Sequence, residues 1–142
     1  MSSIIQWLGK KNISISNWVK QMIKFSSVGV LNTIVDAVVY LILTRWLGFS
    51  GMEVTAKAIS YCAGILNSYI WNKNWTFRSS TGVSKTLIPF VITNLIGLAI
   101  NTGMMQLGLN QLHFHDLLAF IFASGFTIIW NFLMSKFFVF RK

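Results

Sequence analysis

Two long stretches of this sequence contain no charged residue, and that feature constrains the fold more than any other. Residues 86–112 and 117–135 lack lysine, arginine, aspartate and glutamate. Two further apolar runs, residues 25–44 and 54–72, contain a single charge each. Since an α-helix needs roughly 20 apolar residues to cross about 30 Å of hydrocarbon, each run is long enough to span a membrane. The predicted transmembrane helices cover residues 25–47, 52–72, 86–109 and 117–138.

The composition agrees with this prediction. Of the 142 residues, 54% are hydrophobic and only 11% are charged. A soluble domain of this size could not cover so much apolar surface with polar groups. The predicted fold class is therefore an all-α integral membrane protein with four transmembrane helices.

The net charge of +9 is compatible with nucleic-acid binding, but the basic residues form no continuous patch. Most of them precede the first run, fill the second connection or follow the last run. These are Lys10, Lys11, Lys20, Lys24, Lys73, Arg78, Lys85, Lys136, Arg141 and Lys142. The first connection has at most Arg45, and the third has none. The positive-inside rule predicts a multi-pass protein of the cytoplasmic (inner) membrane with both termini cytoplasmic and no nucleic-acid partner.

Residues 1–24 are predicted to form a separate basic segment ahead of a transmembrane domain over residues 25–142. The apolar residues of this segment fall roughly on one helical face, opposite several lysines. They are Ile4, Leu8, Ile15, Trp18, Val19 and Met22. The pattern favours an interfacial amphipathic helix lying on the anionic membrane lipids of the inner leaflet. A flexible basic tail is the alternative.

Two similar strings follow the second and fourth apolar runs. "NSYIWNKNWTFR" covers residues 67–78, and "NFLMSKFFVFR" covers residues 131–141. Pairing Lys73 with Lys136 aligns the neighbouring aromatic residues and arginines of the two strings. We call this alignment the lysine register and interpret it as a duplicated two-helix hairpin. The predicted halves cover about residues 25–78 and 86–142.

The agreement extends upstream with a slightly different alignment. Pairing Phe25 with Phe90 also pairs Asp36 with Asn101, and we call this alignment the phenylalanine register. The two registers differ by two residues, which must be absorbed between the blocks. Each half contains an even number of spans and therefore starts and finishes on the same side of the membrane. The halves are predicted to be parallel repeats related by an axis along the membrane normal.

Polar side chains recur at helical spacing within all four runs. Lipid offers them no hydrogen-bond partner, so they are expected to face a shared protein interior or a water-filled cavity. The predicted intramembrane polar path consists of Asn32, Asp36, Lys57, Asn67, Asn94, Asn101 and Asn131. Small and polar residues also let membrane helices pack closely and hydrogen-bond. That structural role is favoured for Ser60, Gly64, Gly97, Ser124 and Thr127.

The two charges within the runs need partners, because a charge at depth costs roughly 2.5–3.5 kcal/mol on the insertion scale. Counted along ideal helices, Asp36 lies about 16 Å and Lys57 about 22 Å from the inner edge. A lysine side chain can span that difference. We therefore expect an ion pair across the first hairpin, either purely structural or opening during a transport cycle.

Three strings resemble the GtrA-like family over about residues 22–142. They are "FSSVGVLNTIVDAVVYLIL", "NSYIWNKNWTFR" and "NFLMSKFFVFRK". Ser68 stands where that family commonly has asparagine, and Lys73 and Lys136 replace an arginine often found there. The resemblance implies membrane proteins of cell-surface polysaccharide or teichoic acid synthesis that flip polyprenyl-phosphate-linked sugars across the cytoplasmic membrane. It also implies that the chain is not itself a glycosyltransferase.

A carrier for such a lipid needs cations where the phosphate loads and neutral hydrogen-bonding groups along the path. Phosphate or headgroup binding is predicted for Lys73, Lys136, Arg78 and Arg141. The asparagines of the polar path would exchange hydrogen bonds with sugar hydroxyls. Alternatively, topology alone accounts for cations at cytoplasmic helix ends.

No catalytic or metal site is predicted. His113, His115 and Asp116 share the third connection, but their spacing does not indicate a metal site. No serine or cysteine nucleophile has a nearby base. We expect a transporter without a cofactor rather than an enzyme.

Two other functions remain open. One is a non-catalytic membrane subunit that stabilises a polyprenyl-dependent glycosyltransferase partner. The other is a small proton-coupled exporter of lipophilic cations, which Lys57 disfavours because it would repel a cation near Asp36. Four spans bury little surface, so a homo-oligomer or a partner is expected.

Overall fold

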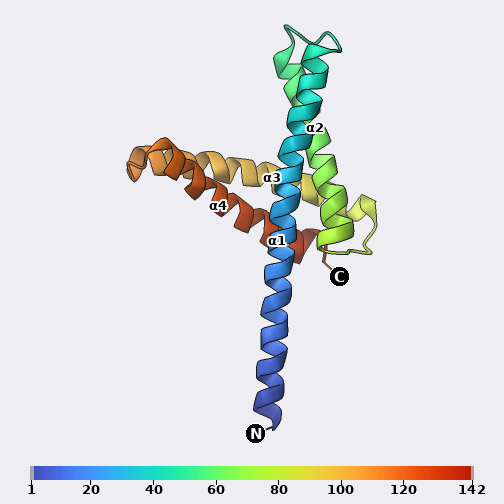
Figure 1. Cartoon of the computed structure of the whole chain (residues 1–142), viewed down its shortest axis with the longest axis vertical. Coiled ribbons are helices and arrows are strands. Elements are labelled where there is room, and N and C mark those ends of the chain that lie inside the picture. The colour runs from blue at the N-terminus through green and yellow to red at the C-terminus, as the bar shows by residue number, and fades with distance from the viewer. Residues whose placement is uncertain (1, 142) are drawn as a thin grey trace. The chain divides into compact units, whose positions relative to one another are not determined.

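The computed structural model describes residues 2–141, and within that range its regular elements are all helices (Figure 1). The all-α prediction is confirmed. The elements, in order, are α1 (Ser2–Arg45), α2 (Glu53–Trp71), η1 (Asn72–Thr76), α3 (Val83–Gln106), η2 (Leu107–Gln111), α4 (Asp116–Met134) and η3 (Ser135–Val139). The chain divides into two compact units, Met1–Arg78 and Ser79–Lys142.

Three helical segments of the described chain are long and apolar enough to cross a membrane. They are Ser14–Arg45, Val83–Gln111 and Asp116–Val139. Such segments are typical of a multi-pass membrane protein. Helix α2 is absent from this set because Lys57 and Asn67, among other polar residues, lower its hydropathy. The predicted fourth span therefore stays a prediction.

Helix α1 runs without a break for 44 residues, so the N-terminal segment is not the separate helix that was predicted. No proline or glycine lies between Gly9 and Gly29, and nothing else in that stretch terminates a helix. Ile15, Trp18 and Val19 are exposed along it. The side chains of Ile4 and Leu8, which were part of the predicted apolar face, lie outside the described part.

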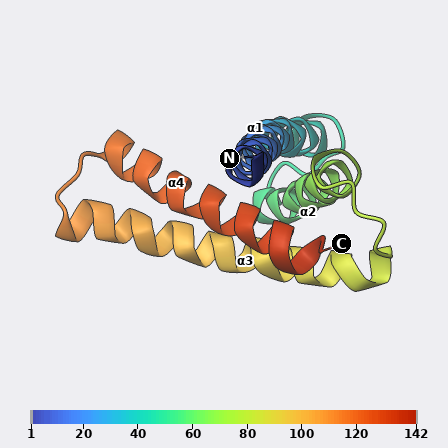
Figure 2. The ribbon, with the colours of Figure 1, turned by 90° about the horizontal axis from the view of Figure 1, so that it is seen from below.

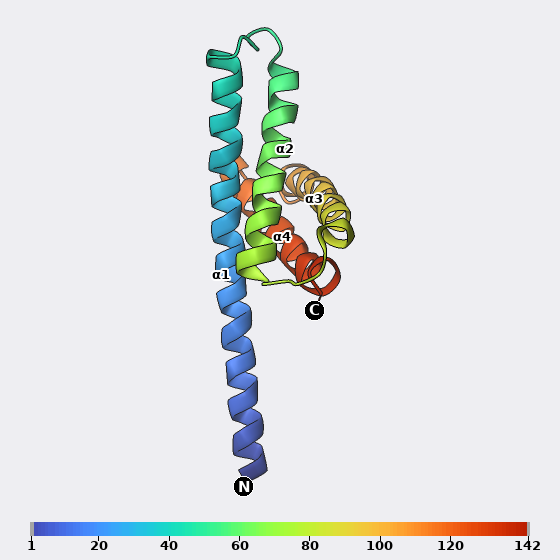
Figure 3. The same cartoon turned by 90° about the vertical axis from the view of Figure 1, so that its right-hand side faces the viewer.

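The first unit is a helical hairpin in which α1 and α2 lie side by side (Figure 3). Residues 46–52 connect them, with Gly48 and Gly51 at φ 77° and 91°, a region that favours glycine. The amide N–H of Phe49 donates to the carbonyl of Leu43 at 3.1 Å. At the other end of the hairpin, the rings of Phe25 and Phe77 lie 6.1 Å apart.

The second unit is also a hairpin, formed by α3 and α4 (Figure 2). At the turn, the amide N–H of Phe114 donates to the carbonyl of Gly108 at 2.9 Å. A Cβ atom on Gly108 would lie 3.1 Å from the Cβ of Ala119, so glycine lets the helices meet there. The rings of Phe90 and Phe140 lie 5.6 Å apart at the far end.

Several internal contacts of the two units correspond to each other. In the lysine register, α2 and α4 begin and end at equivalent positions, as do η1 and η3. The amide N–H of Ala56 donates to the Met52 carbonyl at 3.0 Å, and the amide N–H of Ala119 donates to the His115 carbonyl at the same distance. These two hydrogen bonds are equivalent in the lysine register. The ring pairs at the hairpin ends match under the two predicted registers.

The turns show where the two registers diverge. Phe49 and Phe114 make equivalent turn bonds in the phenylalanine register, whereas Met52 and His115 are equivalent in the lysine register. Ser50 and Gly51 therefore have no counterpart in the second unit.

A single π-helical turn follows each of α2, α3 and α4. In the two corresponding turns, the amide of Phe77 donates to the Asn72 carbonyl at 2.9 Å and that of Phe140 to the Ser135 carbonyl at 2.8 Å. These bonds reach back five residues instead of four, which widens the helix locally. π turns of this kind occur frequently at functional sites.

Candidate substrate-path residues in the two hairpins

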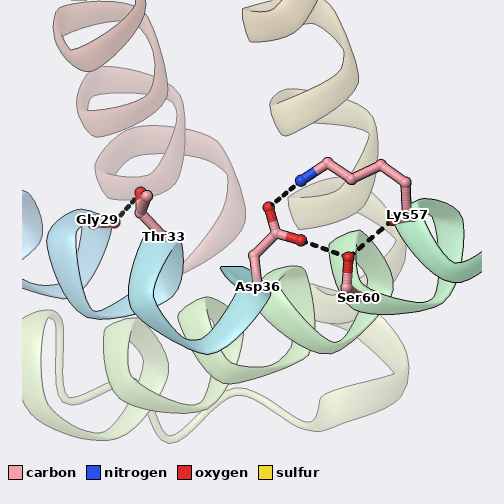
Figure 4. A network of polar contacts seen from close by, with 5 residues as sticks. All are labelled: Gly29, Thr33, Asp36, Lys57 and Ser60. Carbon is pink, nitrogen blue, oxygen red and sulfur yellow. Dashed lines mark hydrogen bonds and ion pairs between the residues drawn. The ribbon is translucent and has the colours of Figure 1, made fainter. Parts of the chain in front are cut away.

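Asp36 forms a charged cluster between α1 and α2. The Nζ atom of Lys57 lies 2.5 Å from Oδ2 of Asp36, and the hydroxyl of Ser60 donates to Oδ1 at 2.6 Å (Figure 4). The same hydroxyl lies 3.0 Å from the Lys57 carbonyl. The predicted ion pair across the first hairpin is confirmed, and each carboxylate oxygen has a donor.

The two members of the ion pair differ in exposure. The side chain of Lys57 is 57% exposed, whereas that of Asp36 is 19% exposed. The carboxylate is thus shielded at the helix interface while the lysine stem runs along the hairpin surface. Moving Lys57 away would leave the shielded Asp36 carboxylate without its partner charge, so opening the pair requires another group to compensate that carboxylate.

The equivalent position in the second hairpin carries a neutral contact. The side-chain amide of Asn101 donates to Oγ1 of Thr127 at 3.1 Å, and the Thr127 hydroxyl donates to the carbonyl of Ala123 at 2.9 Å. Asn101 corresponds to Asp36 in the phenylalanine register, but Thr127 corresponds to Gly64 in the lysine register, so the polar contact of the second hairpin uses a different position on its second helix. Among these contacts, only that of the first hairpin is between charged groups.

A glycine meets an asparagine inside each hairpin. A Cβ atom on Gly64 would lie 2.9 Å from Oδ1 of Asn32, and one on Gly97 would come still closer to Oδ1 of Asn131. Both contacts are closer than a real Cβ atom allows, so alanine at either position would require the facing asparagine side chain to move. The helix-packing interpretation of Gly64 and Gly97 is confirmed, and Asn32 and Asn131 lie at these contacts.

The remaining asparagines of the predicted path differ from each other. The side-chain amide of Asn94 donates to the carbonyl of Phe90 in its own helix at 2.8 Å. The amide nitrogen of Asn67 is buried and has no hydrogen-bond partner among the described residues. Asn67 is therefore the more available of the two for a ligand.

The four predicted phosphate-binding cations occupy corresponding places in the two units. Lys73 and Lys136 are each the second residue of a π turn and are half-buried, whereas Arg78 and Arg141 lie beyond the turns and are exposed. Arg78 has φ 48°, which turns the chain away from the helix. The structure brings Lys73 and Arg78 to one end of the first hairpin, and Lys136 and Arg141 to the matching end of the second.

Aromatic rings accompany the cations at these ends. The Nζ atom of Lys24 lies 5.2 Å from the ring centroid of Trp75, and that of Lys136 lies 5.6 Å from the ring centroid of Phe132. The negative face of an aromatic ring attracts a cation electrostatically and so helps to position it. Lys24 thus joins Lys73 and Arg78 as a cation of the first hairpin end.

The predicted polar path left out three buried polar residues at the ends of α2 and α4. They are Asn72, Thr76 and Ser135. The first two continue a series with Ser60, Gly64 and Ser68 that recurs every four residues. That spacing places the series on one face of the helix and was the signal that could have found them.

The residues of the third connection have a structural role. His115 precedes α4, and its Nδ1 atom accepts a hydrogen bond from the amide of Leu118 at 3.4 Å. Among residues 2–141, no group of three or more histidine, cysteine, aspartate or glutamate side chains is placed to hold a metal.

Comparison with known proteins identifies the family. The model of the family described as "GtrA/DPMS, transmembrane domain" matches residues 24–140. The chain belongs to this family. It therefore is a GtrA/DPMS-type membrane domain, as the resemblance of its three strings predicted.

Two relatives come from Bacillus subtilis (strain 168). The chain is 34% identical over 98 residues to the uncharacterized membrane protein YngA, a match that covers 67% of this chain and 63% of YngA. It is 31% identical over 121 residues to the uncharacterized membrane protein YwcD, a match that covers 80% of this chain and 91% of YwcD.

Proposed function

We propose that this chain flips a polyprenyl-phosphate-linked sugar across the cytoplasmic membrane, where the sugar serves cell-surface polysaccharide or teichoic acid glycosylation. The observation that carries the proposal is the cluster of Asp36, Lys57 and Ser60 in a GtrA/DPMS-type domain. Charges within membrane spans are costly and typically mark substrate or ion pathways. The second hairpin forms with a neutral contact between Asn101 and Thr127, so packing alone does not require charges between the helices.

In this proposal α2 is the fourth span. It matches α4 in length, 19 residues each, and in the π turn that follows. The main obstacle to insertion is Lys57, and Asp36 neutralises it. Because Lys57 lies near the start of α2, its side chain can also reach toward the headgroups.

The two hairpins would then be parallel repeats, with both termini cytoplasmic. The correspondence of their turns, ring pairs and π turns supports the repeat. The positive-inside rule supports the orientation, because the corresponding ends carry Lys73, Arg78, Lys136 and Arg141. These cations would bind the phosphate at the inner headgroup level.

The exposed Lys57 and the exposed apolar residues of all four helices support self-association or a protein partner in addition to lipid contact. We infer no catalytic role for the chain, since its polar groups suit binding and passage rather than bond cleavage.

The test is reconstitution of the purified chain in proteoliposomes with a labelled polyprenyl phosphoryl sugar in the inner leaflet. We expect the sugar to become accessible from outside faster than in protein-free liposomes. Equal rates, together with co-purification of a polyprenyl-dependent glycosyltransferase, would replace the transport proposal with the role of a stabilising membrane subunit.

A further inference from the structure

A line of small polar side chains follows the second helix of each hairpin toward its π turn. In the first hairpin it comprises Ser68, Asn72 and Thr76, and in the second it comprises Asn131 and Ser135. We call these lines the inner polar stripes. In the lysine register, Asn131 corresponds to Ser68 and Ser135 corresponds to Asn72, so the stripes are equivalent features of the two units.

Several atoms of the stripes are buried without a hydrogen-bond partner. Asn72, Thr76 and Ser135 are 1%, 3% and 0% exposed. Nevertheless, Oδ1 of Asn72, Oγ1 of Thr76 and Oγ of Ser135 have no partner among the described residues. A buried polar group in this condition costs about 1–3 kcal/mol, so three of them in two short turns call for an explanation.

The amide group of Asn72 makes one bond within its own stripe. Its Nδ2 atom donates to the hydroxyl of Ser68 at 3.2 Å, which leaves Oδ1 as the open atom. Oδ1 of Asn131, at the matching stripe of the second hairpin, is likewise without a partner among residues 2–141. The open amide atoms of both stripes are therefore acceptors.

The hydrogen-bonding capacity of these unpartnered atoms indicates which kind of ligand would fit them. Amide oxygens only accept hydrogen bonds, whereas the hydroxyls of Thr76 and Ser135 can donate or accept. This set fits a ligand rich in hydroxyl groups, which supply donors. It does not fit phosphate, whose oxygens are acceptors too and would repel the amide oxygens. Lys73 and Lys136, the next residues along the π turns, supply the cations that phosphate needs.

We propose that the inner polar stripes bind the sugar hydroxyls of the lipid-linked substrate while its phosphate stays at the adjacent lysine. This inference rests on the proposed transport function and names its sugar-binding residues. The stripes are covered in the present conformation, and the ring pair of Phe25 and Phe77 lies one residue beyond Thr76.

The substitution Thr76→Val tests the inference with little risk to folding. The residue that corresponds to Thr76 is Val139, which is 3% exposed at the end of the second π turn, so valine fits such a place. The matched control is Thr33→Val, because the Thr33 hydroxyl is exposed and donates to the Gly29 carbonyl of its own helix at 3.1 Å. Ser135→Ala provides the same test in the second hairpin.

The measurement is equilibrium binding to the purified protein in nanodiscs. The probes are a panel of polyprenyl phosphoryl hexoses and N-acetylhexosamines, with bare polyprenyl phosphate as the reference. For the glycosylated lipid that the wild type prefers, we expect Thr76→Val to weaken binding roughly fivefold, the value of one hydrogen bond. Binding of bare polyprenyl phosphate should stay unchanged, and the thermal unfolding midpoint should not fall, because valine removes a buried hydroxyl that has no partner. Thr33→Val should leave lipid binding unchanged.

The outcomes separate the inference from the proposed function. A wild type that binds glycosylated and bare lipids equally would contradict the proposed function itself. A wild type that prefers the glycosylated lipid, with that preference intact in both Thr76→Val and Ser135→Ala, would overturn the inference alone. A lower unfolding midpoint with an unchanged lipid preference would show that these hydroxyls have a structural role only, which would also overturn the inference.

Discussion

The two hairpins have similar backbone arrangements and differ in the side chains that lie between their helices. Both have a ring pair at one end, an equivalent turn at the other, and a π turn after the second helix. Between the helices, the first hairpin has the charged contact of Asp36 with Lys57, and the second has the neutral contact of Asn101 with Thr127. Since the second hairpin forms with a neutral contact between its helices, a hairpin of this kind does not need a charged one. The charged pair is better explained by function than by packing.

A second difference concerns the close contact of glycine with asparagine. In the first hairpin the asparagine lies on the first helix and the glycine on the second, and in the second hairpin the two are exchanged. Asn32 and Gly97 correspond in the phenylalanine register, whereas Asn131 corresponds to Ser68 and not to Gly64 in the lysine register. The two contacts are therefore similar in kind but do not occupy equivalent positions on the second helices.

The largest loss of stability is expected for the ring pairs that both hairpins share. Phe90 is 1% exposed and Phe77 is 5% exposed, so Phe90→Ala and Phe77→Ala each remove a buried ring and leave a cavity. We expect each to lower the free energy of unfolding by about 3–5 kcal/mol, measured by denaturant unfolding in micelles. Phe120→Ala is the control, because Phe120 is 59% exposed. A large loss of stability in one hairpin and none in the other would show that the two ring pairs do not have the same structural role.

A smaller loss is expected at the close contacts. Gly64→Ala forces a Cβ atom to 2.9 Å from the Asn32 side chain, and Gly97→Ala forces one still closer to that of Asn131. We expect losses of about 1–3 kcal/mol, with Gly97→Ala the more severe. The unfolding midpoints of the two variants provide the comparison.

Gly29→Ala is the matched control for these substitutions. A Cβ atom on Gly29 meets nothing within 4 Å, so alanine should be neutral or stabilise the helix by up to about 1 kcal/mol. If Gly97→Ala behaved like Gly29→Ala, the helices of the second hairpin would not approach as closely as described.

The smallest effect is expected for the neutral contact. A double-mutant cycle of Asn101→Ala and Thr127→Ala should give a coupling free energy of about 0.6 kcal/mol, which is typical of hydrogen bonds between membrane helices. The measurement is again denaturant unfolding of the single and double variants. A coupling several times larger would make the neutral contact a main support of the hairpin and weaken the contrast with Asp36.

Much of the fold could be predicted because the sequence signals for it, such as long uncharged runs, extend over many residues. Uncharged runs indicate the apolar helices, and a charge at depth requires a partner, which led directly from Asp36 to Lys57. The lysine and phenylalanine registers aligned Phe77 with Phe140 and Phe25 with Phe90, and these residues form the equivalent ring pairs of the two units. The arrangement of four spans in a membrane and the shared interior for the polar path stay predictions.

Other features of the structure differ too little from a regular α-helix to leave a recognisable pattern in the sequence. A π turn differs from an α turn by a one-residue change in one hydrogen bond, and so short a segment carries no periodicity that distinguishes it. Asn72 and Thr76 were therefore not recognised as buried. The continuation of α1 through residue 24 was also missed, because a change from basic to apolar composition does not end a helix when no residue breaks it.

The most direct test of the account is transport by variants that make the first hairpin resemble the second. Asp36→Asn copies the residue found at position 101 and should preserve the fold, and Lys57→Gln removes the partner charge. With labelled polyprenyl phosphoryl sugar in proteoliposomes, we expect each to reduce flipping at least about tenfold, the effect of about 1.4 kcal/mol, whereas Asn101→Ala retains most of it. Full transport by both charge-neutralised variants at equal insertion would contradict the account.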